Sequence, residues 1–337
     1  MSNPTETGTP AVAESAEAGK RDLKTVLRQS LQQGLAFGTL IVLFIFFSIA
    51  NPAFLQWSNI SGVLLATAVI GILAVGTTLV IITGGIDLSI GTGMTFAAVI
   101  TGVTITNFGL PMWVGILAGM ATGALMGAVN GANIVFLKVP PFIATLAMMM
   151  ITQGLNMVVS GVKPVYIQVD GFKTIALGEL IPGFPNAVLI LFACAIVASI
   201  LLTRTILGRY TFSIGSNEEA TRLSGINTSK WKIIIYMTAG IFTGIAGVVL
   251  ASRLGSAQPQ LGMGYELQAI AAVVIGGTSM LGGRGSILGT LIGALVMSVL
   301  INGLRIMSIQ TEWQNVVVGI VILLAVWSDS LRTRKGA

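Results

Sequence analysis

The chain has 337 residues, of which 54% are hydrophobic and 9% are charged, and its mean hydropathy is +0.91. This composition excludes a soluble globular domain. Because strand-like alternation is absent, it predicts an all-α, polytopic helical membrane protein. The net charge of +6 is spread over short loops, so nucleic acid is not an expected partner. Cys194 is the only cysteine and there is no histidine, so we expect no metal site, resident cofactor or enzyme active site.

The chain divides into three predicted regions. Residues 1–30 are rich in Ala, Thr, Glu and Pro and lack apolar periodicity, which predicts a disordered cytoplasmic N-terminal tail. This tail is not expected to be a signal peptide, because the first apolar run begins only near Gly34. Residues 31–330 are predicted to form the transmembrane domain, and residues 331–337 a short cytoplasmic C-terminal tail.

Apolar runs within the domain predict ten transmembrane helices. With the N-terminus inside, 14 of the 18 basic residues fall in cytoplasmic segments and 4 fall outside, in agreement with the positive-inside rule. Both termini and the segment 204–232 are therefore expected on the cytoplasmic side. The predicted spans are 34–50, 60–83, 91–107, 112–137, 141–160, 186–203, 233–252, 266–282, 286–304 and 314–328.

Glycines recur every fourth residue in two of these spans. The fourth span carries five of them from Gly115 to Gly131, and the ninth carries three from Gly285 to Gly293. Small residues at this spacing predict close helix packing. Four residues turn a helix about 40° past a full circle, so the longer row winds around its helix and predicts more than one neighbour.

Two other glycine clusters interrupt apolar sequence. Gly84 and Gly85 precede Asp87, and Gly276 and Gly277 open the run GGTSMLGGRG. Such runs indicate either hinges in broken helices that line a translocation pathway, or tight cytoplasmic turns, and the sequence favours neither. Asp87 is expected to cap the third span, with direct contact to a solute as the alternative.

Four further polar residues are candidate sites. Gln153 and Asn156 lie three residues apart on one side of the fifth span, where they could bond a hydroxylated solute or a neighbouring helix. Asn302 is a further candidate of this pathway. Glu266 begins the eighth span on the outer side, so we expect it to cap that helix or to pair with a basic residue of a docking protein.

The segment 204–232 contains seven of the thirty charged residues and predicts a handle for a soluble partner. Ser216 and Glu219 have the spacing of a capping box, which predicts a short helix that stops at Gly225. Glu218 and Arg222 are four residues apart and predict a surface ion pair. The apolar contacts of this helix are expected to be Ala220, Leu223 and Ile226.

Glu219-Ala220-Thr221, followed by Gly225, resembles the E-A-A-x-x-x-G coupling motif of ATP-binding-cassette importer permeases. Thr221 replaces the second alanine, and the downstream I-x-L-P element is missing. With these departures, the chain resembles the group of permeases that handles ribose, xylose and arabinose. Within that group it resembles the ribose permeases most closely. The resemblance covers nearly everything after Ala50, and its most similar stretches are 78–91, 141–155, 207–227 and 256–295.

The resemblance implies a two-fold pair of permease subunits in the inner (cytoplasmic) membrane. It also implies a periplasmic or extracellular sugar-binding protein and a cytoplasmic ABC ATPase that holds ATP and Mg. The chain itself lacks the P-loop sequence G-x-x-x-x-G-K-[ST], so we do not expect it to be an ATPase itself. The residues expected to couple to the ATPase are Glu218, Glu219, Ala220, Arg222, Leu223 and Gly225.

Three alternatives stay open. A proton- or sodium-coupled secondary transporter usually needs ionisable groups near the middle of the membrane, and only Asp87 is ambiguous in that respect. A membrane-embedded enzyme is disfavoured by the lack of histidine and of paired carboxylates. A scaffolding role would leave the hinge-like glycines without a purpose.

Overall fold

A computed structural model describes the backbone of residues 34–334 and the side chains as far as Trp327. Its first helix is Gly34–Ala50, and the 3-10 helix η1 (Pro52–Leu55) follows. The later helices are α2 (Trp57–Ile82), α3 (Ile90–Thr106), α4 (Met112–Phe136), α5 (Pro141–Ser160), α6 (Thr174–Leu177), α7 (Asn186–Arg204), α8 (Ile206–Ser216), α9 (Glu218–Leu223), α10 (Thr228–Leu254), α11 (Tyr265–Ile275), α12 (Ile287–Ile306) and α13 (Thr311–Arg334). Two short strands, β1 (Val165–Tyr166) and β2 (Ser256–Ala257), pair antiparallel.

Each of the ten predicted spans coincides with one helix of this structure. Six helices, α2, α4, α5, α7, α10 and α12, are long and apolar enough to cross a membrane, and the other four apolar segments have 10–17 residues. The helical prediction is thus confirmed, whereas ten crossings and the sidedness of the termini stay predictions. The 1–30 tail lies outside the described residues. Residues 331–334, expected in the C-terminal tail, instead continue α13.

The predicted eighth span is wrong in its length. Helix α11 ends at Ile275 rather than 282, because Gly276 and Gly277 follow and Gly277 adopts a φ of +91°. At about 1.5 Å per residue, 11 residues are too short to cross a hydrocarbon core of about 30 Å. The chain then runs without helix to Ser286, which caps α12.

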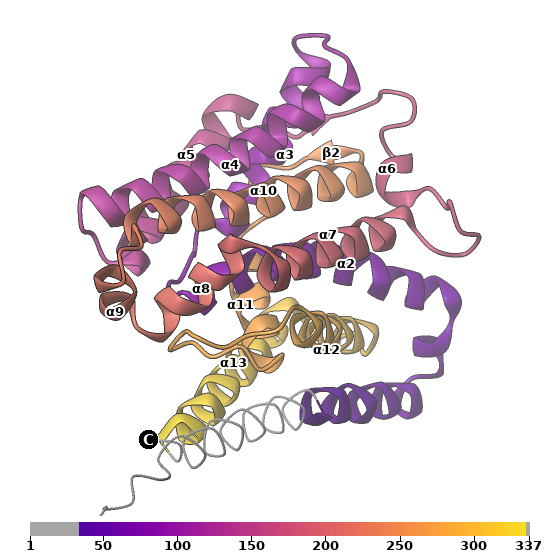
Figure 1. Cartoon of the computed structure of the whole chain (residues 1–337). Coiled ribbons are helices and arrows are strands. Elements are labelled where there is room, and N and C mark those ends of the chain that lie inside the picture. Colours follow the sequence, from indigo (N-terminus) through magenta and orange to yellow (C-terminus); the bar gives the residue numbers. More distant parts are fainter. Residues whose placement is uncertain (1–33, 335–337) are drawn as a thin grey trace, which may run out of the picture.

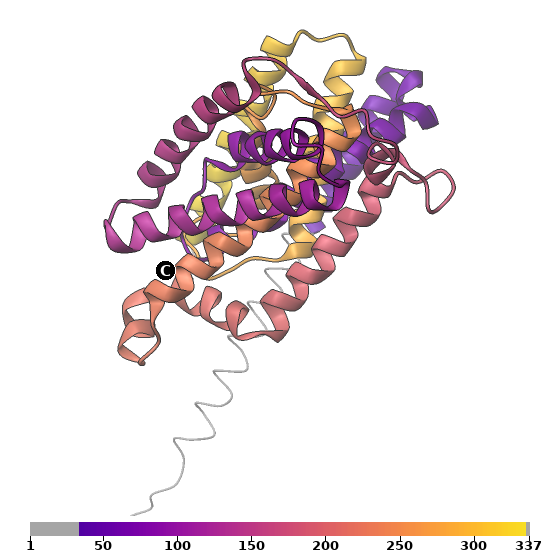
Figure 2. The same ribbon diagram turned by 90° about the horizontal axis from the view of Figure 1, so that it is seen from above.

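Helix α2 lies at the centre of the domain (Figures 1 and 2). From Thr67 to Ile82 every residue is buried, and its side chains join one large apolar cluster with residues of α7, α10, α11 and α12. The hydroxyls of Thr78 on α2 and Thr290 on α12 are 2.7 Å apart within this interior. Since a helix that is apolar all round must be surrounded, α2 is the axis on which the other helices pack.

Helices α4 and α10 are antiparallel and in backbone contact. A Cβ added at Gly244 would lie 2.7 Å from the Gly119 carbonyl oxygen, and one at Gly123 would lie 2.7 Å from the Gly244 nitrogen. Farther along, a Cβ at Gly131 would lie 2.7 Å from the Ile233 Cα. Gly115 instead faces α3, where an added Cβ would lie 3.0 Å from the Thr101 carbonyl oxygen. The prediction that this glycine row packs against more than one helix is confirmed.

Helix α10 also fixes where the two ends of the domain lie. Its 27 residues give a length of about 40 Å. Helix α9 lies just before its first turn, and β2 follows its last residue, so α9 and the β1–β2 pair lie at opposite ends (Figure 1). The end with α9 is the expected cytoplasmic end, and the end with the strands is the expected outer end.

The close approach of α4 and α10 predicts a specific cost of adding one methyl group. Gly127→Ala places a Cβ 2.7 Å from the Tyr236 carbonyl carbon, so we expect a loss of about 1–3 kcal/mol from overpacking. Gly154→Ala is the matched control, since its Cβ meets nothing within 4 Å on helix α5. Thermal unfolding in detergent should separate the two. Equal melting temperatures would contradict the backbone contact.

Candidate functional site

Helix α9 is a short exposed turn held by a side-chain cap. Asn217, not Ser216, is the capping residue, and its Oδ1 accepts the Ala220 amide at 2.9 Å. The predicted capping box is therefore wrong, because Ser216 is still the last residue of α8. The helix stops as predicted, with Gly225 directly beyond it at φ +85°.

The charges of α9 pair differently from the prediction. Arg222 binds Glu219 at 2.6 Å, one turn away, while Glu218 binds Lys232 of α10 at 2.6 Å. The Arg222 guanidinium lowers the pKa of the Glu219 carboxyl, so this pair is charged throughout the neutral range. Leu223 ends the helix with 77% of its surface exposed. A capped helix with an exposed apolar tip and ordered charges is suited to contact with a soluble protein.

Helix α9 is fixed to the domain through α8 and α10. The rings of Tyr210 on α8 and Trp231 on α10 meet edge to face at 4.8 Å. Thr221 is the buried residue of α9, and its hydroxyl donates to the Asn217 carbonyl at 2.8 Å. Because a helix of six residues is unstable alone, the burial of Thr221 and the ion pair of Glu218 with Lys232 of α10 help to hold α9 in place.

The end of α8 touches both glycine-rich loops at one place, which we call the glycine junction: Ile82, Gly84, Gly215, Gly282 and Gly283. The Gly283 amide donates to the Ile82 carbonyl at 2.8 Å. A Cβ at Gly282 would lie 2.8 Å from the Gly215 carbonyl oxygen and 2.9 Å from the Gly84 nitrogen. Backbone thus meets backbone without intervening side chains, and movement of α8 displaces both loops directly.

Asp87 lies in the first of these loops and is 4% exposed. Its Oδ1 accepts the amide of Ser89 at 2.8 Å and the hydroxyl of Ser89 at 2.6 Å, and Asn130 of α4 donates to that hydroxyl at 2.9 Å. Asp87 therefore does not cap α3 directly, since Ser89 occupies the capping position. The carboxylate instead organises the turn that leads into the helix.

Two polar atoms near this turn have no partner among the described residues. They are the Oδ1 of Asn130 and the hydroxyl of Tyr236, which lies against Gly85. Buried polar groups without partners cost about 1–3 kcal/mol each, so they mark places where water or a polar solute is favoured. The first glycine loop is thus a buried polar bend.

The polar residues of α5 face α3, with one exception. Thr152 and Thr92 are 2.7 Å apart, and the Asn156 amide donates to the Thr92 carbonyl at 3.1 Å. Gln153 instead reaches the Met263 sulfur at 3.3 Å, in the segment between β2 and α11. Interhelical bonding therefore accounts for the Nδ2 of Asn156, while its Oδ1 has no partner among the described residues.

Three remaining candidates are structural in their surroundings. Gly276 ends α11 against the backbone of Gly289, where an added Cβ would lie 2.7 Å from the Thr290 nitrogen. Asn302 on α12 has an Oδ1 without a partner in the described part of the chain. Glu266 is 9% exposed and accepts the Gly264 amide at 3.0 Å. Its carboxylate thus bonds the backbone at the start of α11, and the pairing with a docking protein stays a prediction.

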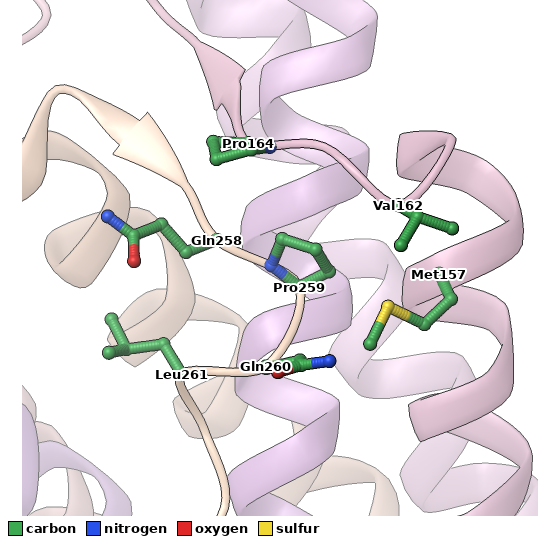
Figure 3. A pocket seen from close by; sticks show the side chains of 7 residues that line it. All are labelled: Met157, Val162, Pro164, Gln258, Pro259, Gln260 and Leu261. Atoms are coloured by element: carbon green, nitrogen blue, oxygen red, sulfur yellow. The ribbon is translucent and has the colours of Figure 1, made fainter.

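A cavity of about 360 Å³, which we call the outer cavity, opens at the β1–β2 end of the domain, the expected outer end. It lies between the end of α5 and the segment before α11 (Figure 3). Its walls are joined by the β1–β2 pair, in which Val165 is opposite Ala257. Figure 3 shows the Gln260 side chain extending toward Met157 of α5, with Pro259 beside it on the same segment. The lining is formed by Met157, Val162, Pro164, Gln258, Pro259, Gln260 and Leu261.

The structure thus brings the candidates together in three places along the domain: α9, the buried bend at Asp87, and the outer end of α5. Sequence reasoning missed the glycine junction and the outer cavity, because both join segments far apart in the chain. It also missed Asn217, although an asparagine directly before two glutamates is a recognisable helix cap.

Comparison with known proteins identifies the family. The model of the "Branched-chain amino acid transport system / permease component" family matches residues 59–326. The chain belongs to this permease family. It is 43% identical to the ribose import permease protein RbsC of Escherichia coli (strain K12) over 295 residues, which cover 86% of this chain and 91% of that protein. It is 42% identical to the same-named protein of Bacillus subtilis (strain 168), covering 86% and 90%.

Permeases named for other sugars are also similar. The L-arabinose transport system permease protein AraH of Escherichia coli (strain K12) is 38% identical over 301 residues, with 88% of this chain and 91% of the relative covered. Together with the six long apolar helices, family membership makes this permease a multi-pass protein of the inner membrane. It is a transport subunit rather than a catalytic enzyme.

The cap of α9 gives a prediction for this permease. Asn217→Ala removes the acceptor of the Ala220 amide, so we expect α9 to lose about 0.5–2 kcal/mol of local stability. Hydrogen exchange of residues 218–224 should accelerate by up to about thirtyfold. Asn217→Asp keeps the acceptor and is the control. An unchanged exchange rate in the alanine variant would show that the cap does not hold this helix.

Proposed function

We propose that this permease translocates ribose or a related monosaccharide across the cytoplasmic membrane as part of an ATP-binding-cassette importer. The relatives named for ribose, xylose and arabinose support a monosaccharide as cargo. The observation that carries the coupling role is α9, a capped helix with an exposed leucine at one end of the domain. A membrane subunit that does not hydrolyse ATP needs such a contact to couple its movement to a subunit that does.

The partners follow from this role. A cytoplasmic ATPase subunit, which holds ATP and Mg, docks on α9, and a sugar-binding protein delivers cargo at the opposite end. A second copy of the permease completes the pathway. The sequence has no P-loop of its own, which supports an external source of energy. The chain's contribution is then to change shape in response to force rather than to break bonds.

The proposed path of that force starts at α9 and passes through α8 to the glycine junction. There the Gly215 backbone touches Ile82 at the end of α2 and the 282–283 loop that leads to α12. Helices α2 and α12 pack on each other through Thr78 and Thr290. A displacement of α9 thus reaches the central helix and its neighbour through close backbone contacts, which transmit strain because packed interiors are hardly compressible.

Charge reversal on α9 tests the coupling role. In vesicles that contain the permease, its ATPase and its sugar-binding protein, we expect Leu223→Asp and Arg222→Glu to lower sugar-stimulated ATP hydrolysis at least tenfold. The reason is that the exposed tip becomes acidic and loses its apolar contact. Leu223→Met and Arg222→Lys, which keep the apolar tip and the positive charge of α9, are the matched controls. Stimulation equal to that of the unchanged protein would refute α9 as the ATPase contact.

A substitution in the glycine junction separates docking from transmission. The added Cβ of Gly215→Ala lies 2.5 Å from the Gly283 nitrogen, so we expect the loops to be pushed away from α8. The ATPase should still bind the variant, whereas ribose uptake per ATP hydrolysed should fall severalfold. Gly62→Ala is the control, because its Cβ meets nothing within 4 Å. Unchanged stoichiometry in a folded Gly215→Ala complex would rule out this path.

A further inference from the structure

We propose that the outer cavity beside α5 is an entry site that binds a neutral monosaccharide weakly before translocation. This inference rests on the proposed function and names a place where the cargo first meets the chain. It is argued from the shape of the cavity, the chemistry of its lining and its connection to the polar residues of α5.

The cavity is fixed in shape by backbone contacts rather than by side chains. The β1–β2 pair and the Ile167 amide, which donates to the Gly255 carbonyl at 2.9 Å, hold its two walls together. On the α5 side, Val162 adopts a φ of +61° and donates its amide to the Met157 carbonyl at 2.9 Å. A left-handed conformation at a β-branched residue costs about 1–3 kcal/mol, and such strain is characteristic of functional positions. The site is therefore formed in advance of binding.

The lining matches a neutral hydroxylated ligand. It contains no charged side chain, so a phosphorylated or acidic solute finds no counter-charge there. Gln260 and Gln258 supply carboxamides, and neither side chain makes a hydrogen bond within the described part of the chain. Each carboxamide can both donate to and accept from a sugar hydroxyl. The prolines, Val162 and Leu261 offer apolar surface to the C–H faces of the ring.

The size of the site suits a small ligand that must leave again. Its volume of about 360 Å³ lies at the lower end of the usual range for small-molecule sites, about 300–1,000 Å³. Gln260 points into it toward Met157, and Gln258 leaves the same segment on the other side, at the rim (Figure 3). A single inward carboxamide gives weak binding, as a conduit requires.

Polar groups of α5 lie within one helical turn of the cavity wall. Met157 in its wall directly follows Asn156, whose Oδ1 is buried and without a partner among the described residues. One turn further in, Gln153 contacts Met263, which belongs to the same segment as Gln260. The carboxamides of Asn156 and Gln153 are thus the polar side chains of α5 next to the proposed entry site.

The test replaces carboxamides by methionines of similar shape. We expect Gln260→Met to weaken the saturation-transfer NMR signal of millimolar D-ribose on the permease in nanodiscs and to lower the maximal D-ribose uptake rate of the complete complex. Both effects should be about threefold to tenfold, the range of one neutral hydrogen bond. Gln258→Met, at the rim, should have the smaller effect. Gln56→Met is the matched control, since Gln56 is exposed before α2 and its side chain caps nothing.

The outcomes separate the site from the importer role. An unchanged NMR signal and uptake rate in Gln260→Met overturn the entry site and leave the importer intact. Weaker docking of the sugar-binding protein with an unchanged NMR signal also overturns it, because the glutamine then contacts protein rather than sugar. A D-ribose signal in the unchanged chain that Gln260→Met removes, without any ATP-driven uptake, supports the site and refutes the importer. Displacement of D-ribose by ribose 5-phosphate at equal concentration contradicts the neutral class.

Discussion

The structure depends on the contact between the backbones of α4 and α10. From Gly119 to Gly131 on one helix and from Ile233 to Gly244 on the other, no side chain separates the two main chains. In a membrane, where apolar surface gains little by leaving lipid, such close van der Waals contact is a main source of helix association. The pair forms a rigid antiparallel unit, and α10 carries that rigidity from the α9 end to the β1–β2 end.

Around this unit the domain divides its chemistry by position. Charge is concentrated at α9, where water is available and ion pairs such as Arg222 with Glu219 form without a large desolvation cost. The interior holds hydroxyls and amides that bond locally, as Thr92 does with Thr152. The one buried carboxylate at the first glycine loop, Asp87, is satisfied by Ser89 rather than by a cation. This division suits a neutral cargo, because no fixed charge has to be passed.

Much of this arrangement could be predicted from the sequence, because hydropathy and glycine spacing report on local structure. The apolar runs located every apolar helix, and the four-residue glycine period predicted the α4 contacts. Predictions of partners within the chain were less accurate. Glu218 was expected to bind Arg222 but binds Lys232, since long side chains choose among several neighbours at similar cost. The predicted length of the eighth span was wrong because no charged residue occurs between Gly276 and Gly283, although the helix has already ended at Ile275.

The candidate site was predicted only in part for a related reason. The residues proposed to couple to an ATPase lie within one short segment, so their motif was visible in the sequence. The glycine junction and the cavity beside α5 instead arise where segments about 70 to 200 residues apart meet. Single-sequence patterns contain no information on such pairings. The antiparallel strands that close the cavity have two residues each, which is below what alternation can reveal.

The straight course of α10 has a thermodynamic consequence. Its second turn binds the Glu218 carboxylate through Lys232, and its last residue leads into the strand that forms one wall of the outer cavity. Linkage is reciprocal: if a ligand bound at one end of α10 alters the affinity for a second ligand at the other end, the second alters the affinity for the first by the same free energy. If cargo bound at the β1–β2 end changes the affinity for the proposed ATPase at the α9 end, the ATPase changes the affinity for cargo by the same factor.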